Sequence, residues 1–346
     1  MPSLSSWLEG WRRVLAAPLI VIAIALMTLL AALPLALVLR AQIAAHLGPS
    51  LMADAAADGV NWDWWQEFTS QATGVGATFT PSVIGFAATL DHMSSLLDGQ
   101  REIVPVAAAI ATYLLVWVFL SGGILDRYAR GRPTRAYGFF AACGVFFWRF
   151  LRLGLVAAAA YWFLFAYVHE KFFAQWYVDL TGNLAAERPA FLWRLAFYSV
   201  FGLLLVTVNV VIDFAKVRLV VEDRRSALGA LSASLAFIGR NVGAVIGLYA
   251  LNAIVFVLLI GLWALAAPGA GRAGGLMWLG VIGTQLYILA RLMLKLQFMS
   301  SETALFQRRL AHAAYTAAPA PVWPDSPAAE AISAHPAAPS APSAAS

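Results

Sequence analysis

Two carboxylates in the stretch 61–68, which reads NWDWWQEF, have a spacing that acid–base chemistry can use. Asp63 and Glu67 lie four residues apart, so a helix places both on one face. A carboxylate pair of this kind can exchange protons with a substrate or bind a cation. Such pairs also occur on ordinary exposed helices, and Asp63 followed by Gln66 fits a capping box, which gives Asp63 a structural role. We therefore favour the structural interpretation and keep catalysis as the alternative.

Three tryptophans surround these carboxylates. On a helix, Trp62 and Trp65 share one face, and Trp64 and Phe68 share another. Tryptophans at such positions anchor helices at the depth of lipid head groups, which is the favoured interpretation. Stacking of the rings on a sugar or on a lipid head group is the alternative. The candidate outer-surface binding residues are Trp62, Asp63, Trp64, Trp65 and Glu67.

The remaining reactive residue types form no familiar catalytic or metal-binding motif. The five histidines lack the spacing to another histidine, cysteine or carboxylate that metal motifs have. The sequence contains no nucleophile elbow, phosphate loop or dinucleotide fingerprint. Cys143 is the only cysteine, so no intrachain disulfide can form. We therefore expect no metal, no cofactor and no enzymatic activity of these classes.

Neutral polar side chains occur near the middle of the long apolar runs, whereas ionisable ones are nearly absent there. The scarcity of ionisable groups argues against a proton-coupled pump of ordinary design. The usual role of neutral polar groups in a membrane is interhelical hydrogen bonding, and we favour it. The lining of a pore or substrate cavity is the alternative. The candidate cavity-lining residues are Thr28, Thr112, Asn252 and Gln285.

The elements that must position all these residues are membrane helices. The chain has 346 residues, of which 61% are hydrophobic and only 12% charged, and its mean hydropathy is +0.75. A soluble domain carries about a quarter charged residues. Uncharged apolar runs near the roughly 20-residue length of a bilayer crossing predict six spans, at 14–39, 103–125, 153–167, 195–212, 242–267 and 275–290. The third is short unless it begins near Phe146 and its arginines snorkel, and an end at Phe298 is the alternative for the sixth. The predicted fold is an all-α membrane protein: a bundle of six transmembrane helices with interfacial amphipathic helices.

Six spans place both termini on one side of the membrane. Most of the 23 basic residues flank the spans on that side, so the positive-inside rule predicts N-in and C-in. Residues 1–13 are then a cytoplasmic N-terminus and 14–312 are the membrane domain. Its external loop covers 41–102, and an amphipathic helix is expected at 80–98. Residues 313–346 are rich in Ala, Pro and Ser and are expected to form a disordered cytoplasmic tail.

Two of the cytoplasmic connections look alike. Each begins at the end of a span with an aspartate, an aromatic residue, an alanine and a base, which run from Asp126 to Arg130 and from Asp213 to Lys216. Each continues as a basic, mildly amphipathic segment, which predicts an interfacial helix near the anionic head groups of the inner leaflet. We favour a local ion pair that anchors each turn. A vestibule that both aspartates face together is the alternative.

The second of these connections, 213–241, reads DFAKVRLVVEDRRSALGALSASLAFIGRN. The pattern is similar to one in families of bacterial polytopic membrane proteins, and it resembles the membrane domain fused to some glycerophosphodiester phosphodiesterases. The resemblance implies a helical domain of the bacterial inner membrane. The sequence has no counterpart of the catalytic phosphodiesterase domain, so the resemblance implies neither an activity nor a substrate.

The predicted function is that of a non-enzymatic bacterial inner-membrane protein, which serves as a transport, lipid-handling or complex-assembly component. One alternative is a membrane enzyme that acts on a lipid-linked head group at the outer surface through Asp63 and Glu67. Another is a structural scaffold that recruits partners through its tail. The predicted partners are membrane lipids, with anionic head groups at the cytoplasmic face. A protein partner or a homo-oligomer fits the same features, and no feature indicates nucleic acid.

Overall fold

The computed structural model describes residues 2–48, 50–58, 61–79, 94, 97–98, 104–131, 133–184, 186–266 and 275–309. Over these residues every regular element is a helix, and six of the helices are long and apolar enough to cross a membrane. They are α2 (Pro18–Leu47), α6 (Val104–Arg130), α7 (Ala136–Phe163) continued by α8 (Tyr177–Thr181), α9 (Glu187–Val221), α11 (Val242–Ala266) and α12 (Gly275–Arg309). The predicted all-α bundle of six membrane-spanning helices is confirmed.

Two of these helices are longer than the sequence predicts. The third span, predicted at 153–167, lies inside one helix, Ala136–Thr181, in which α7 and α8 are joined by the π-helical stretches Leu164–His169 and Lys171–Trp176. The sixth, predicted at 275–290, continues to Arg309. Arginine and lysine are good helix formers, so basic residues lower the hydropathy of a run without ending its helix.

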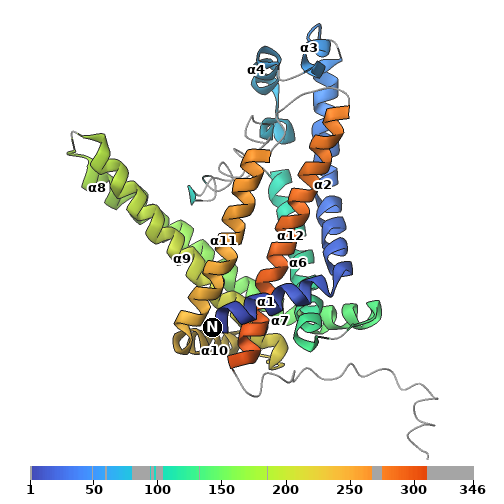
Figure 1. The fold of residues 1–346 in the computed structure, drawn as a ribbon. Coiled ribbons are helices and arrows are strands. Elements are labelled where there is room, and N and C mark those ends of the chain that lie inside the picture. Colours follow the sequence, from blue (N-terminus) through green and yellow to red (C-terminus); the bar gives the residue numbers. More distant parts are fainter. Residues whose placement is uncertain are drawn as a thin grey trace, which may run out of the picture.

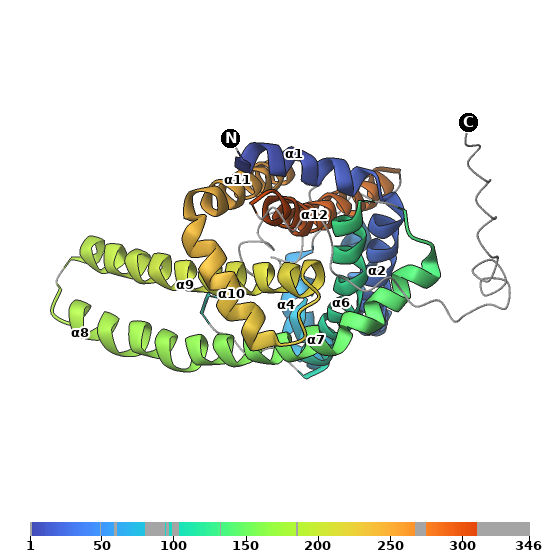
Figure 2. The same cartoon turned by 90° about the horizontal axis from the view of Figure 1, so that it is seen from below.

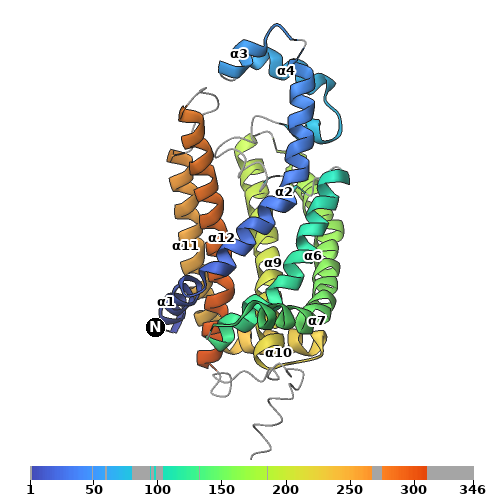
Figure 3. The same ribbon diagram turned by 90° about the vertical axis from the view of Figure 1, so that its right-hand side faces the viewer.

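Three segments lie crosswise at one end of the bundle, which we call the basal end. They are α1 (Pro2–Leu15), α10 (Ala227–Arg240) and the first part of α7, which runs beneath the bundle before it turns upwards (Figures 1 and 3). The second predicted interfacial helix is therefore a separate element, α10, whereas the first is continuous with the helix that follows it. The predicted N-terminal segment 1–13 is mostly helical and belongs to α1, which hydropathy alone does not reveal.

Buried side chains gather toward the basal end. Along α12 the stretch 300–306 is buried, whereas Trp278, Ile282 and Leu286 are exposed. Toward the other, apical end the helices separate, and the hairpin of α8 and α9 leans away from α11 (Figures 1 and 2). Exposed apolar side chains along spans of this length are suited to contact with lipid rather than with water. The bundle is thus held together mainly at its base.

Three phenylalanines illustrate how the base is packed. Phe237 of α10 contacts Phe214 of α9 and Phe306 of α12, with ring centroids 5.2 Å and 5.0 Å apart. All three rings are almost fully buried. Burial of each such side chain contributes about 1.5–3 kcal/mol, so α10 fastens two of the spanning helices to each other.

Two glycines allow close helix crossings at the same end. A Cβ atom at Gly123 of α6 would lie 2.8 Å from the Phe139 carbonyl oxygen of α7 and 2.7 Å from the Cys143 sulfur. A Cβ atom at Gly10 of α1 would lie 2.9 Å from the Ser301 Cβ atom of α12. Distances this short leave no room for a side chain, so both crossings depend on glycine.

The outer segment between the first two spans begins with three short helices at the apical end: α3 (Ala53–Asp58), α4 (Trp62–Gln71) and the 3₁₀ helix η1 (Gly74–Thr78) (Figure 1). Most of the segment 80–98, where an amphipathic helix is predicted, lies outside the described residues. The whole of the predicted tail, 313–346, also lies outside them.

Candidate functional site

The stretch 61–68 forms α4 together with its N-cap. The side chain of Asn61 accepts a hydrogen bond from the Trp64 backbone N–H at 2.9 Å, so Asn61 is the N-cap. The predicted capping role of Asp63 is therefore wrong, because the helix already begins at Trp62, with Asn61 as its N-cap. Asp63 lies in the first turn, where its carboxylate interacts favourably with the helix dipole.

The tryptophans of α4 have structural partners. Trp62 stacks on Trp65 with 4.6 Å between ring centroids, and Trp64 stacks on Phe68 at 5.4 Å, as their predicted faces require. The Trp64 indole N–H donates to Nδ1 of His46 in α2 at 3.0 Å. Trp64 and Phe68 are buried, so this face docks α4 onto the end of α2.

The two carboxylates of α4 are exposed. Asp63 and Glu67 lie on the face of the helix away from the buried aromatic rings. Within the part of the chain that the structure describes, neither carboxylate makes an ion pair. Among the described residues no third group converges on these two solvated carboxylates, as an enclosed site for acid–base catalysis would require.

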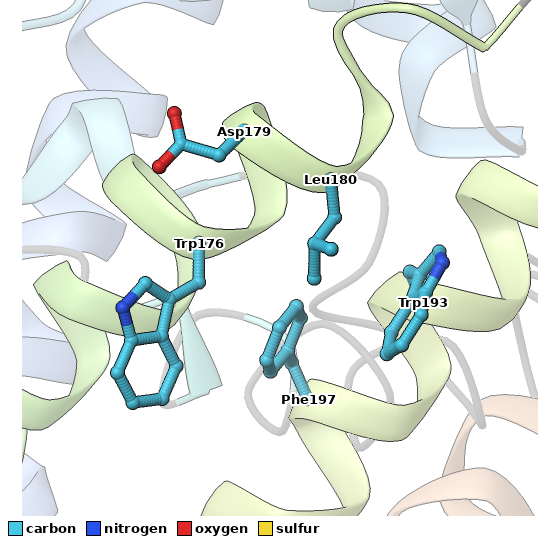
Figure 4. Close-up of a pocket in the computed structure, with 5 residues that line it drawn as sticks. All are labelled: Trp176, Asp179, Leu180, Trp193 and Phe197. Carbon is cyan, nitrogen blue, oxygen red and sulfur yellow. The ribbon is translucent and has the colours of Figure 1, made fainter.

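A cavity of about 360 Å³ lies near the tip of the α8–α9 hairpin. It is lined by Trp176, Asp179, Leu180, Trp193 and Phe197 (Figure 4). Leu180 points toward Phe197, whereas the Asp179 carboxylate points away from both (Figure 4). The cavity is thus an apolar pocket between aromatic side chains, of the kind found where helix ends meet lipid head groups.

The four candidate cavity-lining residues do not come together. The hydroxyls of Thr28 and Thr112 donate to carbonyl oxygens one turn earlier in their own helices, at 2.9 Å each. Gln285 is exposed. Only Asn252 is fully buried, and its Nδ2 atom donates to Ser301 Oγ of α12 at 3.2 Å. Of these four, Asn252 alone joins two helices.

Each of the two aspartates at the span ends, Asp126 and Asp213, pairs with a base on its own helix. Arg130 Nε lies 2.8 Å from Asp126 Oδ1, and Lys216 Nζ lies 2.7 Å from Asp213 Oδ1. Asp126 has a local anchoring geometry of the kind we favoured from the sequence. Asp213 differs, because its second oxygen accepts from Asn209 at 2.8 Å and its surroundings include ionisable groups of other helices.

These ionisable groups form what we name the basal polar cluster, and four helices contribute to it. The Tyr249 hydroxyl of α11 donates to Oε1 of Glu302 in α12 at 2.6 Å, and it also lies within interaction range of Asp213. The cluster comprises Tyr161 of α7, Asp213 and Lys216 of α9, Tyr249 of α11, and Lys295 and Glu302 of α12.

The cluster has one buried and one accessible side. Glu302 is only 2% exposed. The side chains of Asp213 and Lys216 are 18% and 31% exposed, and Lys295 is more exposed still. The buried side is continuous with the hydrogen bond between Asn252 and Ser301, since Asn252 and Tyr249 lie three residues apart on α11 and Ser301 adjoins Glu302. A polar group that enters between the helices would therefore meet hydrogen-bond donors and acceptors, and both positive and negative side chains.

Lys295 reaches across to another helix. Its Nζ atom lies 3.6 Å from the ring centroid of Trp117 and 5.5 Å from that of Tyr113, both in α6. It is also within electrostatic range of Lys216 and Asp213 on α9. The ammonium group thus lies between α6, α9 and α12, and not along the outer surface of its own helix.

Sequence reasoning identified Asp213, Lys216 and Asn252 but missed Tyr249, Lys295 and Glu302. Lys295 and Glu302 were missed because hydropathy falls after residue 290, where the uncharged apolar run of the sixth span ends. A usable signal was present: Leu289, Leu292, Met293 and Leu296 continue the helical spacing of apolar residues beyond that point. That periodicity places Lys295 and Glu302 on the same helix as the sixth span.

Ion pairs outside the spans bind the basal elements together. Arg149 of α7 pairs with Asp223, which follows α9 and has φ 49°, in the left-handed region that aspartate tolerates. Burial alone would raise the pKa of the neighbouring Glu222, but hydrogen bonds from Arg218 and Arg224 lower it below its usual value. This turn is therefore fixed to both α7 and α9.

In α1 a second ion-pair group holds the helix against α6 and α12. Hydrogen bonds from Arg12, opposed by burial and reinforced by Arg13, lower the pKa of Glu9 to about 2. Arg13 also donates to the Tyr128 carbonyl oxygen of α6 and to Gln307 Oε1 of α12, at 2.9 Å each. The charged side chains of α1 thus help to hold this helix against α6 and α12.

Within the described ranges no three side chains of histidine, cysteine, aspartate or glutamate gather as a metal site would require. Comparison with known proteins adds no further assignment: no family model, curated protein or solved structure matches the chain.

Proposed function

We propose that the chain is a non-enzymatic transport component of the bacterial inner membrane, and that the basal polar cluster is where it holds a small polar solute or head group. The observation that carries the proposal is the meeting of ionisable side chains from α7, α9, α11 and α12 on the inner side of the spans. Ionisable groups within membrane helices are costly, and they commonly mark the path or binding site of a substrate.

The geometry of the cluster favours binding over a purely structural role. A structural ion pair is complete in itself, as Asp126 and Arg130 are. Glu302, by contrast, is buried with a tyrosine hydroxyl as its hydrogen-bond partner, and the described residues place no base within ion-pair distance of it. A bound solute with a hydrogen-bond donor group would supply the buried Glu302 side chain with the further partner that it lacks.

The proposed orientation places the basal end in the cytoplasm. The ends of the described chain, at Pro2 in α1 and Arg309 in α12, lie at this end, and Arg12, Arg308 and Arg309 are exposed beside them. Basic residues at the cytoplasmic ends of spans support an N-in, C-in topology under the positive-inside rule. A reporter fused after residue 346 that is active only outside the cytoplasm should then stay inactive.

The function is tested by solute-dependent stabilisation of the purified protein in lipid nanodiscs. The thermal unfolding midpoint is measured with Na⁺, K⁺, inorganic phosphate, glycerol 3-phosphate, choline and amino acids at matched ionic strength. A solute that binds the folded state at 100 times its Kd stabilises it by about 2.7 kcal/mol. We expect at least one solute to raise the midpoint of the natural protein and to lose this effect in the D213N/E302Q double variant.

A second double variant, D63N/E67Q, neutralises the same number of carboxylates at the apical end. We expect it to respond to solutes as the natural protein does. Loss of the response in D63N/E67Q with retention in D213N/E302Q would overturn the proposal and favour the outer-surface enzyme. A panel in which no solute stabilises the natural protein would also overturn it.

A further inference from the structure

The cations of the basal polar cluster and its surroundings outnumber the carboxylates available to them. Lys216 is paired with Asp213, and Glu302 is hydrogen-bonded to Tyr249. Lys295 remains, and Arg291 lies one turn before it on α12, within electrostatic range. In the part of the chain that the structure describes, no carboxylate lies within ion-pair distance of either. These two basic groups therefore lie one turn apart on α12, and neither has an ion-pair partner among the described residues.

Snorkelling toward the lipid surface does not account for the position of Lys295. A lysine that snorkels extends its ammonium group away from neighbouring helices toward the head-group layer. The Lys295 ammonium instead lies over the ring of Trp117 in α6 and within range of Lys216 and Asp213 in α9. Its ammonium group thus lies against α6, although the Lys295 side chain as a whole is exposed.

Arg291 is positioned by an aromatic pair. Its guanidinium carbon lies 5.7 Å from the ring centroid of Tyr287, and that ring stacks on Trp263 of α11 at 4.6 Å with an angle of 8° between the planes. The Tyr287 side chain is 9% exposed, and its buried hydroxyl has no hydrogen-bond partner among the described residues. A buried hydroxyl without a hydrogen-bond partner is costly unless a further group accepts from it, whereas the Arg291 side chain is itself exposed and open to a ligand.

From this arrangement we infer that Arg291 and Lys295, assisted by Lys216, bind the phosphate group of a phosphomonoester or phospholipid ligand. A guanidinium donates two parallel hydrogen bonds to phosphate oxygens, and an ammonium group adds a compact positive charge. The aromatic rings of Trp117 and Tyr287 lie beside the two cations and suit an apolar remainder of the ligand. This inference rests on the proposed function and names the chemical class of what the cluster holds.

The test measures binding by the R291Q/K295Q double variant and by a matched control, R308Q/R309Q, which loses the same charge at the exposed end of the same helix. The probes are inorganic phosphate, glycerol 3-phosphate, short-chain phosphatidic acid and the diacylglycerol with the same acyl chains. Each is titrated into delipidated protein in a neutral detergent while the thermal unfolding midpoint is followed. The single variant K295Q serves if the double variant does not fold.

We expect at least one phosphate compound to stabilise the natural protein and the control, with affinity for R291Q/K295Q weaker by about tenfold or more, since each charge-assisted hydrogen bond is lost. Stabilisation by glycerol 3-phosphate or inorganic phosphate identifies a free phosphate compound as the ligand. Stabilisation by phosphatidic acid but not by diacylglycerol or free phosphate identifies a lipid head group.

Equal affinity of all three proteins for every phosphate compound, or no stabilisation by any, would overturn the inference. The proposed function fails on a different result, namely that no solute of the wider panel stabilises the natural protein. If another solute of the panel stabilises the natural protein but not D213N/E302Q, the cluster is a binding site and only its assignment to phosphate is wrong.

Discussion

The hydrogen bond between Tyr249 and Glu302 joins α11 to α12, and a double-mutant cycle through Y249F and E302Q measures its strength. Hydrogen bonds between membrane helices couple by about 0.6 kcal/mol on average. We expect a larger value here for two reasons. The 2.6 Å distance between hydroxyl and carboxyl oxygen is in the short range found for carboxylate acceptors, and Glu302 is only 2% exposed, so water cannot replace the lost donor. The expected coupling free energy is about 1.5–3 kcal/mol.

The assay is reversible unfolding in mixed micelles, with the free energy of unfolding obtained for the natural protein, both single variants and the double variant. T112V is the matched control, because Thr112 is exposed and its hydroxyl donates within its own helix. We expect T112V to change the free energy of unfolding by less than about 0.5 kcal/mol. A coupling free energy below about 0.5 kcal/mol between Tyr249 and Glu302 would refute the reasoning and reduce the cluster to independent surface-like contacts.

Three further predictions concern the packing and charges of the basal end. G123A should lose about 1–3 kcal/mol of unfolding free energy, because the new methyl group meets a backbone carbonyl of α7 at 2.8 Å. G144A, in open space on α7, should instead gain up to about 1 kcal/mol from helix propensity in the same unfolding measurement. Because arginine hydrogen bonds lower the pKa of Glu9 from 4.5 to about 2, its contribution is complete above pH 4.5 and is lost as the pH falls toward 2. The thermal midpoint of E9Q should therefore lie below that of the natural protein at neutral pH and converge with it in acid; a constant gap would contradict this. Arg149 and Asp223 pair across α7 and the turn after α9, so R149Q and D223N should each raise amide hydrogen exchange in that turn, and the double variant should raise it no further than either alone.

Hydropathy and charge distribution predicted the number of spans because a bilayer fixes the length of an apolar run. They did not predict where the helices end. α12 continues past Arg291 and Lys295 to Arg309, since neither residue type disrupts helical hydrogen bonding. The same reasoning explains why α1 was missed: its arginines and polar residues conceal a helix that packs on α11 and α12 and whose buried residues are Ser6, Gly10 and Val14.

The candidate site was predictable only in part, for a related reason. Asp213 and Lys216 stand out because they lie three residues apart in the sequence and are opposite in charge. Tyr249 and Glu302 have no local signal, since their significance comes from a contact between residues 53 positions apart. A prediction of that contact requires the relative rotation of α11 and α12. The rotation is set by packing at the base, including Phe306 and Leu248, and not by either helix alone.

The position of the basal polar cluster has a mechanical consequence that does not follow from its chemistry alone. Buried contacts gather at the basal end, where the cluster lies, whereas toward the apical end the helices separate and expose apolar side chains. Helices joined at one end and surrounded by lipid at the other can change their tilt with little loss of packing, and the change pivots about the joined end. A ligand bound at Asp213, Lys295 and Glu302 would lie at that pivot and contact both α9 and α12. A ligand shifts the population between two tilts only by the difference in its binding free energy for them. Because atoms near the pivot move least, a ligand there would fasten the joined ends of α9 and α12 to each other rather than drive the apical ends apart.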